Sequence, residues 1–368
     1  MEKKKIYHIH TDFKFLYDSY RFENEFFENE IVFIGEKDDS NKLYHDSAIF
    51  FSDNDEQLDT LVKRIRDADL IVFYGLCDAK KKILNEIPSG IKKIWRFFGY
   101  ELYGTRHDLM FSRKTLEVIY KRKSYIVGFS FWLNFYYKVF KQRIKNKREL
   151  EYLKKIDYIL LFSEEEYVYL KKNWNVPKFL KLNLDEFLEE SNFKVAKSQV
   201  IVGNSRNRYN NHLDILGLIP KHYSDVNFVF FLNYGNKGNY HQEVLEQIHL
   251  LERYTIFDEF LDKEEFAKIY STSSTFVLNS YRQMALGNIF LSLKYGLKLY
   301  LNDKNPLQQW LRNHGVKVTS TNDFKNDLLN QNISLTEKEK VDNLEAFNKL
   351  FLSYTKNDLC NQVYSILK

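Results

Sequence analysis

The sequence predicts an α/β protein of two Rossmann-like domains, each built on a parallel sheet. Three observations lead to this prediction. The chain has 368 residues, more than one compact core usually holds. Short apolar runs alternate with segments of helical periodicity along most of the chain. A charged, irregular stretch after Pro177 and through Ser198 separates two such series. We therefore expect an N-terminal domain at 1–190 and a C-terminal domain at 191–368, with room for the C-terminal helices to pack back on the first domain.

The first series supplies five expected strands. Runs rich in β-branched and aromatic residues lie at 6–10, 31–34, 70–74, 91–97 and 156–162. Between the second and third of these runs, residues 58–66 carry apolar side chains at helical spacing and predict a helix. Strands joined by helices return to the same edge of a sheet, so a parallel arrangement is expected.

The second series is clearer. Strands are expected at 200–203, 226–232, 254–257, 275–279 and 298–301, and helices at about 210–217, 240–251, 263–271, 284–295 and 305–313. This alternation is typical of a doubly wound sheet. Ligands of such sheets bind beyond the carboxyl ends of the strands, so the residues that follow each strand are the candidates for function.

Composition and charge exclude several classes of protein. The net charge is only +5, so we expect no nucleic-acid partner. The two cysteines, Cys77 and Cys360, lie far apart and outside any Cys/His cluster, which argues against a disulfide framework or structural zinc. The basic N-terminus lacks the apolar stretch of a signal peptide, and a cytoplasmic location is expected.

Residues 125–140 form the least polar stretch, but they are too short and too interrupted for a membrane span. A basic run follows directly: Lys141, Arg143, Lys145, Lys147 and Arg148. Two interpretations stay open. The segment is either a peripheral contact with an anionic membrane surface or an amphipathic helix that covers the sheet.

The first candidate binding cluster follows the expected strand at 200–203. A glycine lets the backbone approach a ligand closely, the helix that follows offers free N–H groups, and an arginine adds positive charge. These are the components of a diphosphate site. The candidates for binding a diphosphate here are Gly203, Asn204, Ser205, Arg208, Asn210 and His212.

A second cluster follows the expected strand at 275–279, where Arg282, Gln283, Gly287 and Asn288 lead into a helix. The arginine is suited to phosphate oxygens and the glutamine to sugar hydroxyls. Two further candidates follow strands of the same series: Tyr234 comes after the expected strand at 226–232, and Glu259 comes after the one at 254–257. For the side chains of the two clusters, capping a helix or saturating backbone carbonyl groups remains the structural alternative.

These residues resemble a known family. The strings Val202–Ser205, Arg208 with Asn210 and His212, Arg282–Gln283 with Gly287–Asn288, and Leu301–Asn302 with Asn305–Pro306 are similar to the TDP-N-acetylfucosamine:lipid II N-acetylfucosaminyltransferases of enterobacterial common antigen synthesis, the 4-alpha-L-fucosyltransferase family. The first domain carries a thinner resemblance at Thr11–Asp12 and at Trp95 with Gly99, Glu101, Leu102 and Tyr103.

The resemblance implies a GT-B glycosyltransferase with two Rossmann-like domains whose sheets face each other across a cleft. It implies a TDP-4-acetamido-4,6-dideoxygalactose donor, bound by the two clusters, and a polyprenyl-diphosphate-linked glycan acceptor on the inner face of a bacterial inner membrane. In such a fold Tyr234 is expected beside the nucleotide and Glu259 at a ribose hydroxyl. A base on the first domain would deprotonate the acceptor hydroxyl. Asp12 and Glu101 are the candidates, and the sequence favours Asp12 because the family pattern has Asp where this chain has Glu101.

No metal or other cofactor is expected. The strings Asp53–Asp55 and Asp67–Asp69 have the DxD form that binds metal in other glycosyltransferases, but neither follows a strand. Two alternatives to the leading function remain. One is a GT-B transferase that uses another nucleotide sugar, such as a UDP sugar, in O-antigen, capsule or protein glycan assembly. The other is a non-catalytic module that only binds nucleotide sugars.

Overall fold

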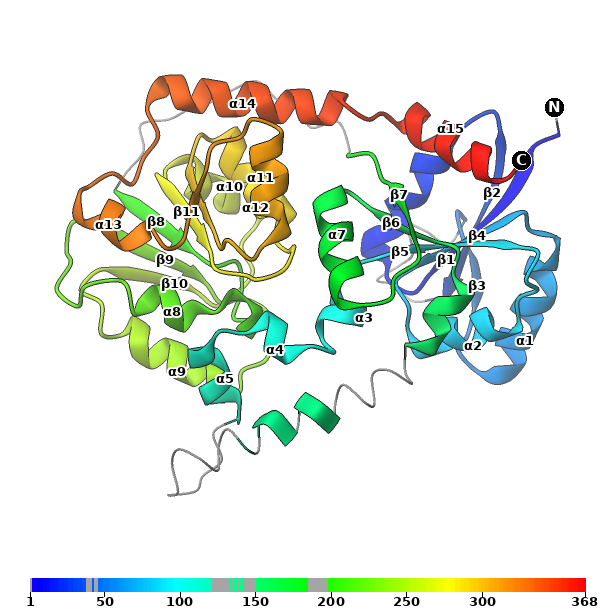
Figure 1. Ribbon diagram of the computed structural model, residues 1–368, viewed down its shortest axis with the longest axis horizontal. Helices are drawn as coiled ribbons and strands as arrows, with labels where there is room; N and C mark the ends of the chain where they lie inside the picture. Colours follow the sequence, from blue (N-terminus) through cyan, green and yellow to red (C-terminus); the bar gives the residue numbers. More distant parts are fainter. Residues whose placement is uncertain are drawn as a thin grey trace. The chain divides into compact units, whose positions relative to one another are not determined.

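A computed structural model describes residues 2–37, 42, 46–120, 133, 135–137, 139–141, 150–184 and 198–368. The chain forms two compact units (Figure 1). Unit 1 consists of Met1–Thr105, Arg143–Glu186 and Phe351–Lys368. Unit 2 consists of Arg106–Gln142 and Phe187–Leu350. Each unit is therefore assembled from segments that are distant in the sequence. Most of the expected linker, residues 185–197, lies outside the described residues.

Unit 1 contains a seven-stranded sheet in the order β3-β2-β1-β4-β5-β6-β7, and every recorded pairing is parallel. The strands are β1 (Lys4–His10), β2 (Phe27–Ile34), β3 (Ile49–Phe51), β4 (Leu70–Tyr74), β5 (Lys92–Arg96), β6 (Tyr158–Leu161) and β7 (Lys178–Lys181). The strand order reverses between β1 and β4, where Ile9 pairs with Phe73. Ligand sites of doubly wound sheets lie at such a reversal.

The helices of unit 1 are η1 (Phe13–Phe22), α1 (Asp55–Arg64), η3 (Ile65–Asp67), α2 (Asp78–Glu86), α3 (Tyr100–Tyr103), η4 (Glu151–Lys155), α7 (Glu164–Asn173) and α15 (Lys356–Ile366). Strand residues Leu70 and Val72 pack in one core cluster with Leu359 and Val363 of α15. The C-terminal helix thus completes the core of the unit that contains the N-terminus.

Unit 2 contains a six-stranded parallel sheet in the order β10-β9-β8-β11-β12-β13. The strands are β8 (Gln199–Val202), β9 (Asn227–Phe231), β10 (Tyr254–Phe257), β11 (Thr275–Leu278), β12 (Lys298–Leu301) and β13 (Val318–Ser320). Here the order reverses between β8 and β11, where Val202 pairs with Val277. The residues after these two strands therefore lie side by side.

Helices cover both faces of this sheet, and Figure 1 shows α8 and α9 on one face and α10, α11 and α12 on the other. The helices of unit 2 are α4 (His107–Met110), α5 (Arg113–Tyr120), η5 (Arg208–Asn210), α8 (His212–Leu216), α9 (Asn239–Ile248), α10 (Lys263–Ser271), α11 (Leu286–Lys294), α12 (Pro306–Asn313), α13 (Phe324–Leu329) and α14 (Glu337–Leu352). The alternating pattern of short buried strands and amphipathic helices accounts for this arrangement.

The expected fold class is confirmed, and all ten expected strands are present with ends shifted by a few residues. Three short strands, β3, β7 and β13, were not expected. β7 corrects the prediction that the chain is irregular from Pro177 onward. Its Leu180 is buried and pairs with Leu160 of β6, while lysines at both strand ends hide the apolar pattern from a sequence-based reading.

None of the described helices is both long enough and apolar enough to cross a membrane. The basic run predicted to contact lipid falls mostly outside the described residues, at Arg143, Lys145, Lys147 and Arg148. Lys141 is described and exposed.

Candidate active site

The turn that follows β8 depends on a glycine. Gly203 has a φ of +72°, a conformation that L side chains rarely adopt, and its N–H donates to the carbonyl of Val277 at 2.8 Å. A Cβ at this position would lie 2.4 Å from Nε2 of His212. The positive φ and the close approach of the histidine ring each require glycine here, so the backbone of the turn is fixed by packing beneath it.

Asn210 closes the same turn from inside. Its side-chain amide donates to the carbonyl of Ser205 at 3.0 Å, and its Oδ1 accepts from the N–H of Asn204 at 3.2 Å. The amide of Asn204 in turn donates to the hydroxyl of Tyr234 at 2.9 Å. Asn210 is 1% exposed and both ends of its amide are bonded within the turn, so its side chain holds the turn in place.

His212 is also buried, and its contacts are internal. Its backbone N–H donates to the hydroxyl of Tyr240 at 2.8 Å. Burial, with a smaller contribution from nearby His241, lowers the pKa of His212 to about 3. The ring is therefore neutral at physiological pH and supports Gly203 without adding charge to the site.

A pair of asparagines connects the ends of the two central strands. The amide of Asn211 donates to the carbonyl groups of Met110 and Asn279, each at 3.2 Å, and Asn279 returns a hydrogen bond to the carbonyl of Asn211 at 3.3 Å. Asn302, which follows β12, donates to Oδ1 of Asn279 at 2.7 Å. The reasoning from sequence did not single out Asn211 and Asn279. The available signal for Asn279 was its place directly after β11, as Asn302 directly follows β12, whereas Asn211 follows η5 and had no such signal.

The structure brings the two predicted arginines to neighbouring aromatic rings. The guanidinium group of Arg282 lies 4.5 Å from the ring centroid of Tyr209, and that of Arg208 lies 5.1 Å from the ring of Phe111. The two rings are 4.9 Å apart. Flat cations on aromatic faces lose little mobility when they bind a phosphate, so this part of unit 2 is suited to an anion.

Helix α11 begins beside Arg282 with its first N–H groups open. Its N-cap residue, Ala285, has a φ of 58° and provides no side-chain cap. A Cβ built on Gly287 meets nothing within 4 Å, so the space over the first turn is free in the described structure. Uncapped N–H groups and the helix dipole favour a negative group at this point.

The two polar side chains beside this helix end differ in direction. The amide of Asn288 donates to the hydroxyl of Tyr270 at 2.7 Å and so faces α10. Oε1 of Gln283 is buried without a hydrogen-bond partner among the described residues. A buried amide oxygen of this kind is available to a sugar hydroxyl or an ordered water.

The ends of β9 and β10 form a second part of the candidate site. Arg206, which is 5% exposed, donates from its backbone to the carbonyl of Tyr234 at 3.1 Å and from its guanidinium group to the carbonyl of Asp258 at 3.1 Å. The rings of Tyr234 and Phe260 lie nearly parallel, 6.4 Å between centroids and 12° between planes. Both rings are exposed, 43% for Tyr234 and 76% for Phe260. Glu259 lies in the same turn and is exposed.

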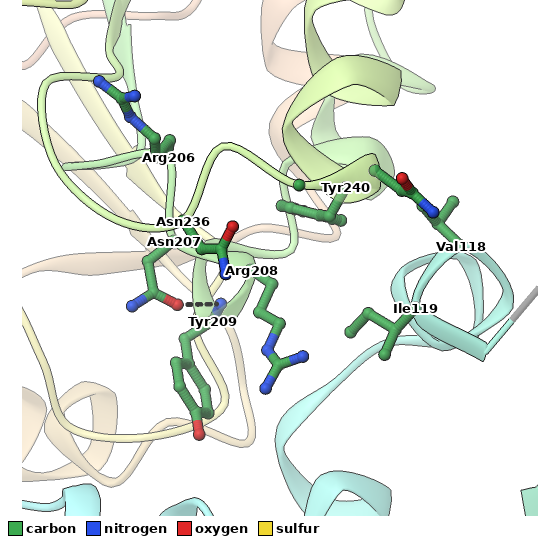
Figure 2. Close-up of a pocket in the computed structure, with 10 residues that line it drawn as sticks. Val118, Ile119, Arg206, Asn207, Arg208, Tyr209, Asn236 and Tyr240 are labelled. Carbon is green, nitrogen blue, oxygen red and sulfur yellow. Dashed lines mark hydrogen bonds between the residues drawn. The ribbon is translucent and has the colours of Figure 1, made fainter.

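A pocket of about 390 Å³ lies beside these turns, as Figure 2 shows. Its lining combines the 206–209 turn, the start of α9 and the end of α5: Val118, Ile119, Arg206, Asn207, Arg208, Tyr209, Asn236, Gly238, Asn239 and Tyr240. The side chain of Arg208 extends between Tyr209 and Ile119 (Figure 2). Of the predicted donor-binding residues, Arg208 is the one that lines this pocket. The pocket therefore adjoins the strand-end cluster and does not coincide with it.

The two candidate bases of unit 1 have very different surroundings. Asp12 is exposed, and its carboxylate accepts the N–H of Lys14 at 2.9 Å as the N-cap of η1. Glu101 is 8% exposed, and its Oε1 accepts from Nε1 of Trp95 at 3.1 Å. Its Oε2 has no hydrogen-bond partner among the described residues. Burial raises the pKa of Glu101, against hydrogen bonds from backbone N–H groups and from Trp95.

The carboxylates of the two DxD strings are engaged elsewhere. Asp55 pairs with Lys82 at 2.7 Å, Asp67 with Lys5 at 2.8 Å, and Asp69 with Lys4 at 3.0 Å. No cluster of three or more His, Cys, Asp or Glu residues suited to a metal occurs among the described residues. Three of these four carboxylates are thus paired with lysines. The second string precedes β4, but the first follows the short strand β3, which corrects the expectation that neither string follows a strand.

A family profile decides the identity of the chain. The profile described as 4-alpha-L-fucosyltransferase, glycosyl transferase group 56, matches residues 161–360, more than half of the chain. The chain belongs to this family of glycosyltransferases. The resemblance found in the sequence is thereby confirmed at the level of the family. No curated protein sequence matches the chain.

Solved structures show that this family 56 glycosyltransferase has the GT-B fold. Anabaena Alr3699/HepE in complex with UDP and glucose is 12% identical, has a TM-score of 0.60, and is covered over 99% of each chain. A glycosyltransferase from Rickettsia africae is 12% identical with a TM-score of 0.60 over 100% of this chain and 98% of that one. The lipopolysaccharide outer core galactosyltransferase WaaB, in its apo form, is 10% identical with a TM-score of 0.59 over 98% and 99%.

The packing around Gly203 predicts a strong effect of one methyl group on stability. Gly203→Ala should lower the free energy of unfolding by about 1–3 kcal/mol, because the new Cβ requires both a strained φ and movement of His212. Gly287→Ala is the matched control, since its Cβ meets open space, and its free energy of unfolding should stay within about 0.5 kcal/mol of wild type. Urea denaturation followed by tryptophan fluorescence measures both. Equal stability of the two variants would contradict the packing described here.

Proposed function

We propose that this glycosyltransferase moves an amino-deoxy sugar of the 4-acetamido-4,6-dideoxygalactose type from a dTDP-linked donor to a polyprenyl-diphosphate-linked glycan. The observation that carries the donor part is the convergence, on the carboxyl edge of one sheet, of the Gly203 turn, Arg282 and the uncapped start of α11. A diphosphate fits this set because it carries two negative groups for one helix end and nearby guanidinium groups. The complexes of Anabaena Alr3699/HepE with UDP and with UDP-glucose support a nucleotide-sugar ligand for the fold.

We place the nucleobase at the ends of β9 and β10. Tyr234 and Phe260 present exposed and nearly parallel rings, and the hydroxyl of Tyr234 is fixed by the amide of Asn204. Flat bases stack well on such rings. Glu259, in the same turn, is proposed to accept a ribose hydroxyl. The thymine rests on the family resemblance, and a uracil-based donor is the alternative that the same rings would accept.

The proposed reaction uses Glu101, and not Asp12, as the base. The acceptor oxygen forms a bond to C1 of the sugar while the bond between C1 and the diphosphate oxygen breaks. Glu101 takes the proton of the acceptor hydroxyl, and dTDP leaves. Burial raises the pKa of Glu101 toward the range in which a carboxylate works as a base, whereas Asp12 is an exposed helix cap.

No metal is required in this proposal. The arginines and the start of α11 would neutralise the leaving diphosphate, as a metal does in other transferases. The alternative donors and the non-catalytic module remain the competing functions. The buried Glu101, with one oxygen unpartnered among the described residues, favours catalysis over binding alone, because a binding module has no use for it.

We propose peripheral membrane association through the aromatic segment before residue 141. Its described helical residues expose Leu133, Tyr136, Tyr137 and Phe140, each by more than half of its surface, at the spacing of one helix face. Phe135 and Val139 of the same segment are buried. An exposed apolar stripe beside basic residues is suited to an anionic lipid surface, where a polyprenyl acceptor would lie.

Removal of the Arg282 guanidinium group should weaken donor binding. Arg282→Ala is expected to raise the Kd for dTDP by about 10- to 150-fold, because a charge-assisted contact to phosphate contributes about 1.5–3 kcal/mol. Isothermal titration calorimetry measures the change. Arg253→Ala is the control, since Arg253 binds the carbonyl of Ser224 at the amino end of the sheet.

Unchanged dTDP affinity in Arg282→Ala would overturn the diphosphate assignment. The same titrations are run in EDTA, where wild-type affinity should persist. A wild-type affinity that is lost in EDTA and restored by Mg²⁺ or Mn²⁺ would contradict the metal-free part of the proposal.

The choice of base predicts different outcomes for two amide substitutions. Glu101→Gln should lower kcat by about 10²- to 10⁴-fold with dTDP affinity retained. Asp12→Asn should keep kcat within a few-fold, because asparagine also caps helices. Release of dTDP from the donor in the presence of a lipid-linked acceptor gives the turnover. Loss of turnover in Asp12→Asn alone would exchange the roles, and activity in both variants would place the base elsewhere.

Exposed aromatics should control binding to lipid. Replacement of Tyr136, Tyr137 and Phe140 together by serine is expected to weaken sedimentation with phosphatidylglycerol-rich vesicles by roughly tenfold or more, because their apolar area no longer enters the interface. Tyr17→Ser removes an equally exposed aromatic from unit 1 and should leave sedimentation unchanged. If the triple variant sediments like the wild type, the stripe has another role.

A further inference from the structure

Lys80 is a buried cation at the carboxyl edge of the unit 1 sheet. It lies on α2, where Lys80, Ile83 and Leu84 are the buried residues, so its side chain faces the sheet with the apolar side of the helix. The side chain is 0% exposed. Its Nζ donates to the carbonyl of Tyr74 at 2.5 Å and to the hydroxyl of Thr11 at 3.1 Å.

Both of these partners are neutral. Within the part of the chain that the structure describes, no carboxylate lies at ion-pair distance from the Lys80 ammonium. A buried charge without a counter-ion is costly, and a protein gains no stability from it that an apolar residue could not supply. Such a group points to a functional role.

Glu101 lies on the other side of the same strand end. Lys80 binds the carbonyl of Tyr74, and Gly75 is the next residue. A Cβ built on Gly75 would lie 3.4 Å from Oε1 of Glu101. Gly75 has a φ of +71°, and the hydroxyl of Tyr100 lies 3.0 Å from the same Cβ position. The tight turn at Gly75 therefore keeps a buried ammonium and a buried carboxyl near one another without direct contact.

We propose that Lys80 is a positioning residue for the transfer reaction, whose ammonium group keeps the Glu101 carboxyl ionised and ready to accept the proton of the acceptor hydroxyl. The inference rests on the proposed role of Glu101 as base. It adds a residue that neither the sequence motifs nor the family resemblance indicated.

The electrostatics of the two groups agree with this geometry. Burial raises the pKa of Glu101, and the charge of Lys80 opposes that rise. Burial lowers the pKa of Lys80 to about 8, and interactions with Cys77 and with the carboxylates of Glu101 and Asp12 oppose that fall. At neutral pH the lysine is therefore mostly protonated, and its charge favours the ionised carboxylate.

Other titratable groups face the pair from each neighbouring element: His10 of β1, Asp12 before η1, Tyr74 of β4, Cys77 before α2 and Tyr100 of α3. Burial lowers the pKa of His10 well below its usual value and raises the pKa values of Tyr74 and Tyr100, so these three groups stay neutral near pH 7. Lys80 is then the cation of this cluster.

The test is the pH dependence of kcat/KM. A base must be deprotonated, so Glu101 gives the acidic limb, and loss of the Lys80 charge should move that limb to higher pH. In Lys80→Gln, which keeps a donor for Tyr74 and Thr11, kcat/KM on the acidic limb should fall about three- to tenfold. The plateau at higher pH should stay within about twofold, and dTDP affinity should not change.

Lys82→Gln is the matched control, because Lys82 lies two residues further on the same helix and pairs with Asp55 at the surface. Its acidic limb should match that of the wild type. A folded Lys80→Gln enzyme with an unmoved acidic limb, or with the same loss at every pH, would overturn the proposal and leave Lys80 an anchor for α2. If Lys80→Gln does not fold, Lys80→Met decides by the same criterion, since apolar residues of similar volume often replace buried ions.

The two proposals fail in different ways. If Glu101→Gln keeps its turnover, the assignment of the base is wrong, whatever Lys80 does. If Glu101→Gln is inactive and the acidic limb of Lys80→Gln does not move, Glu101 remains the base and only the role of Lys80 is lost.

Discussion

Gly203 and His212 keep their places only because residue 203 lacks a side chain. The buried ring of His212 fills the space where a Cβ would lie, and Asn210 fastens the turn above it. The turn then positions Asn204, through which Tyr234 is held, and it aligns the end of β8 with the end of β11. Close packing beneath the backbone therefore holds the Gly203 turn of the candidate donor site in place, and few of the groups in this turn are exposed.

Both units bury polar groups at the carboxyl ends of their strands. In unit 2 these include amides, which satisfy one another through the reciprocal bonds of Asn211 and Asn279. In unit 1 they include the charged groups Lys80 and Glu101, and the acceptor capacity of Glu101 is left partly unused among the described residues. A satisfied network holds geometry, whereas an unsatisfied buried carboxyl is reactive. This difference is why we assign binding to the first set and proton transfer to the second.

The sequence predicted the fold well because its strands are short apolar runs, several of which are followed directly by glycine or asparagine, and the hydrophobic pattern carries that information directly. It also located both clusters of unit 2, since parallel strands bring their carboxyl ends to one edge. It could not separate residues that face a ligand from residues that hold the turn. Asn210 and His212 look like ligand contacts in a motif, yet both are buried. The Asn210 amide binds the backbone of its own turn, and the backbone N–H of His212 binds the hydroxyl of Tyr240.

Lys80 shows the opposite limit. The first of three consecutive lysines reads as a surface residue, and only its spacing with Ile83 and Leu84 on one helix face could have indicated burial. Likewise Asp12 matched the family pattern better than Glu101 did, but burial, which sets the chemistry of a carboxyl group, depends on the tertiary packing around Trp95. Charge and burial, rather than similarity to the family motif, are the reasons why we assign the base to Glu101 and not to Asp12.

The central claim is that a thymidine diphosphate donor binds at the carboxyl edge of the unit 2 sheet. A crystal structure of the protein with dTDP tests it most directly. The account predicts difference density for the diphosphate over the first turn of α11, within contact of Arg282, with the thymine beside Tyr234 and Phe260. Density for dTDP in the pocket between α5 and the start of α9, away from Gly287 and Arg282, would contradict it.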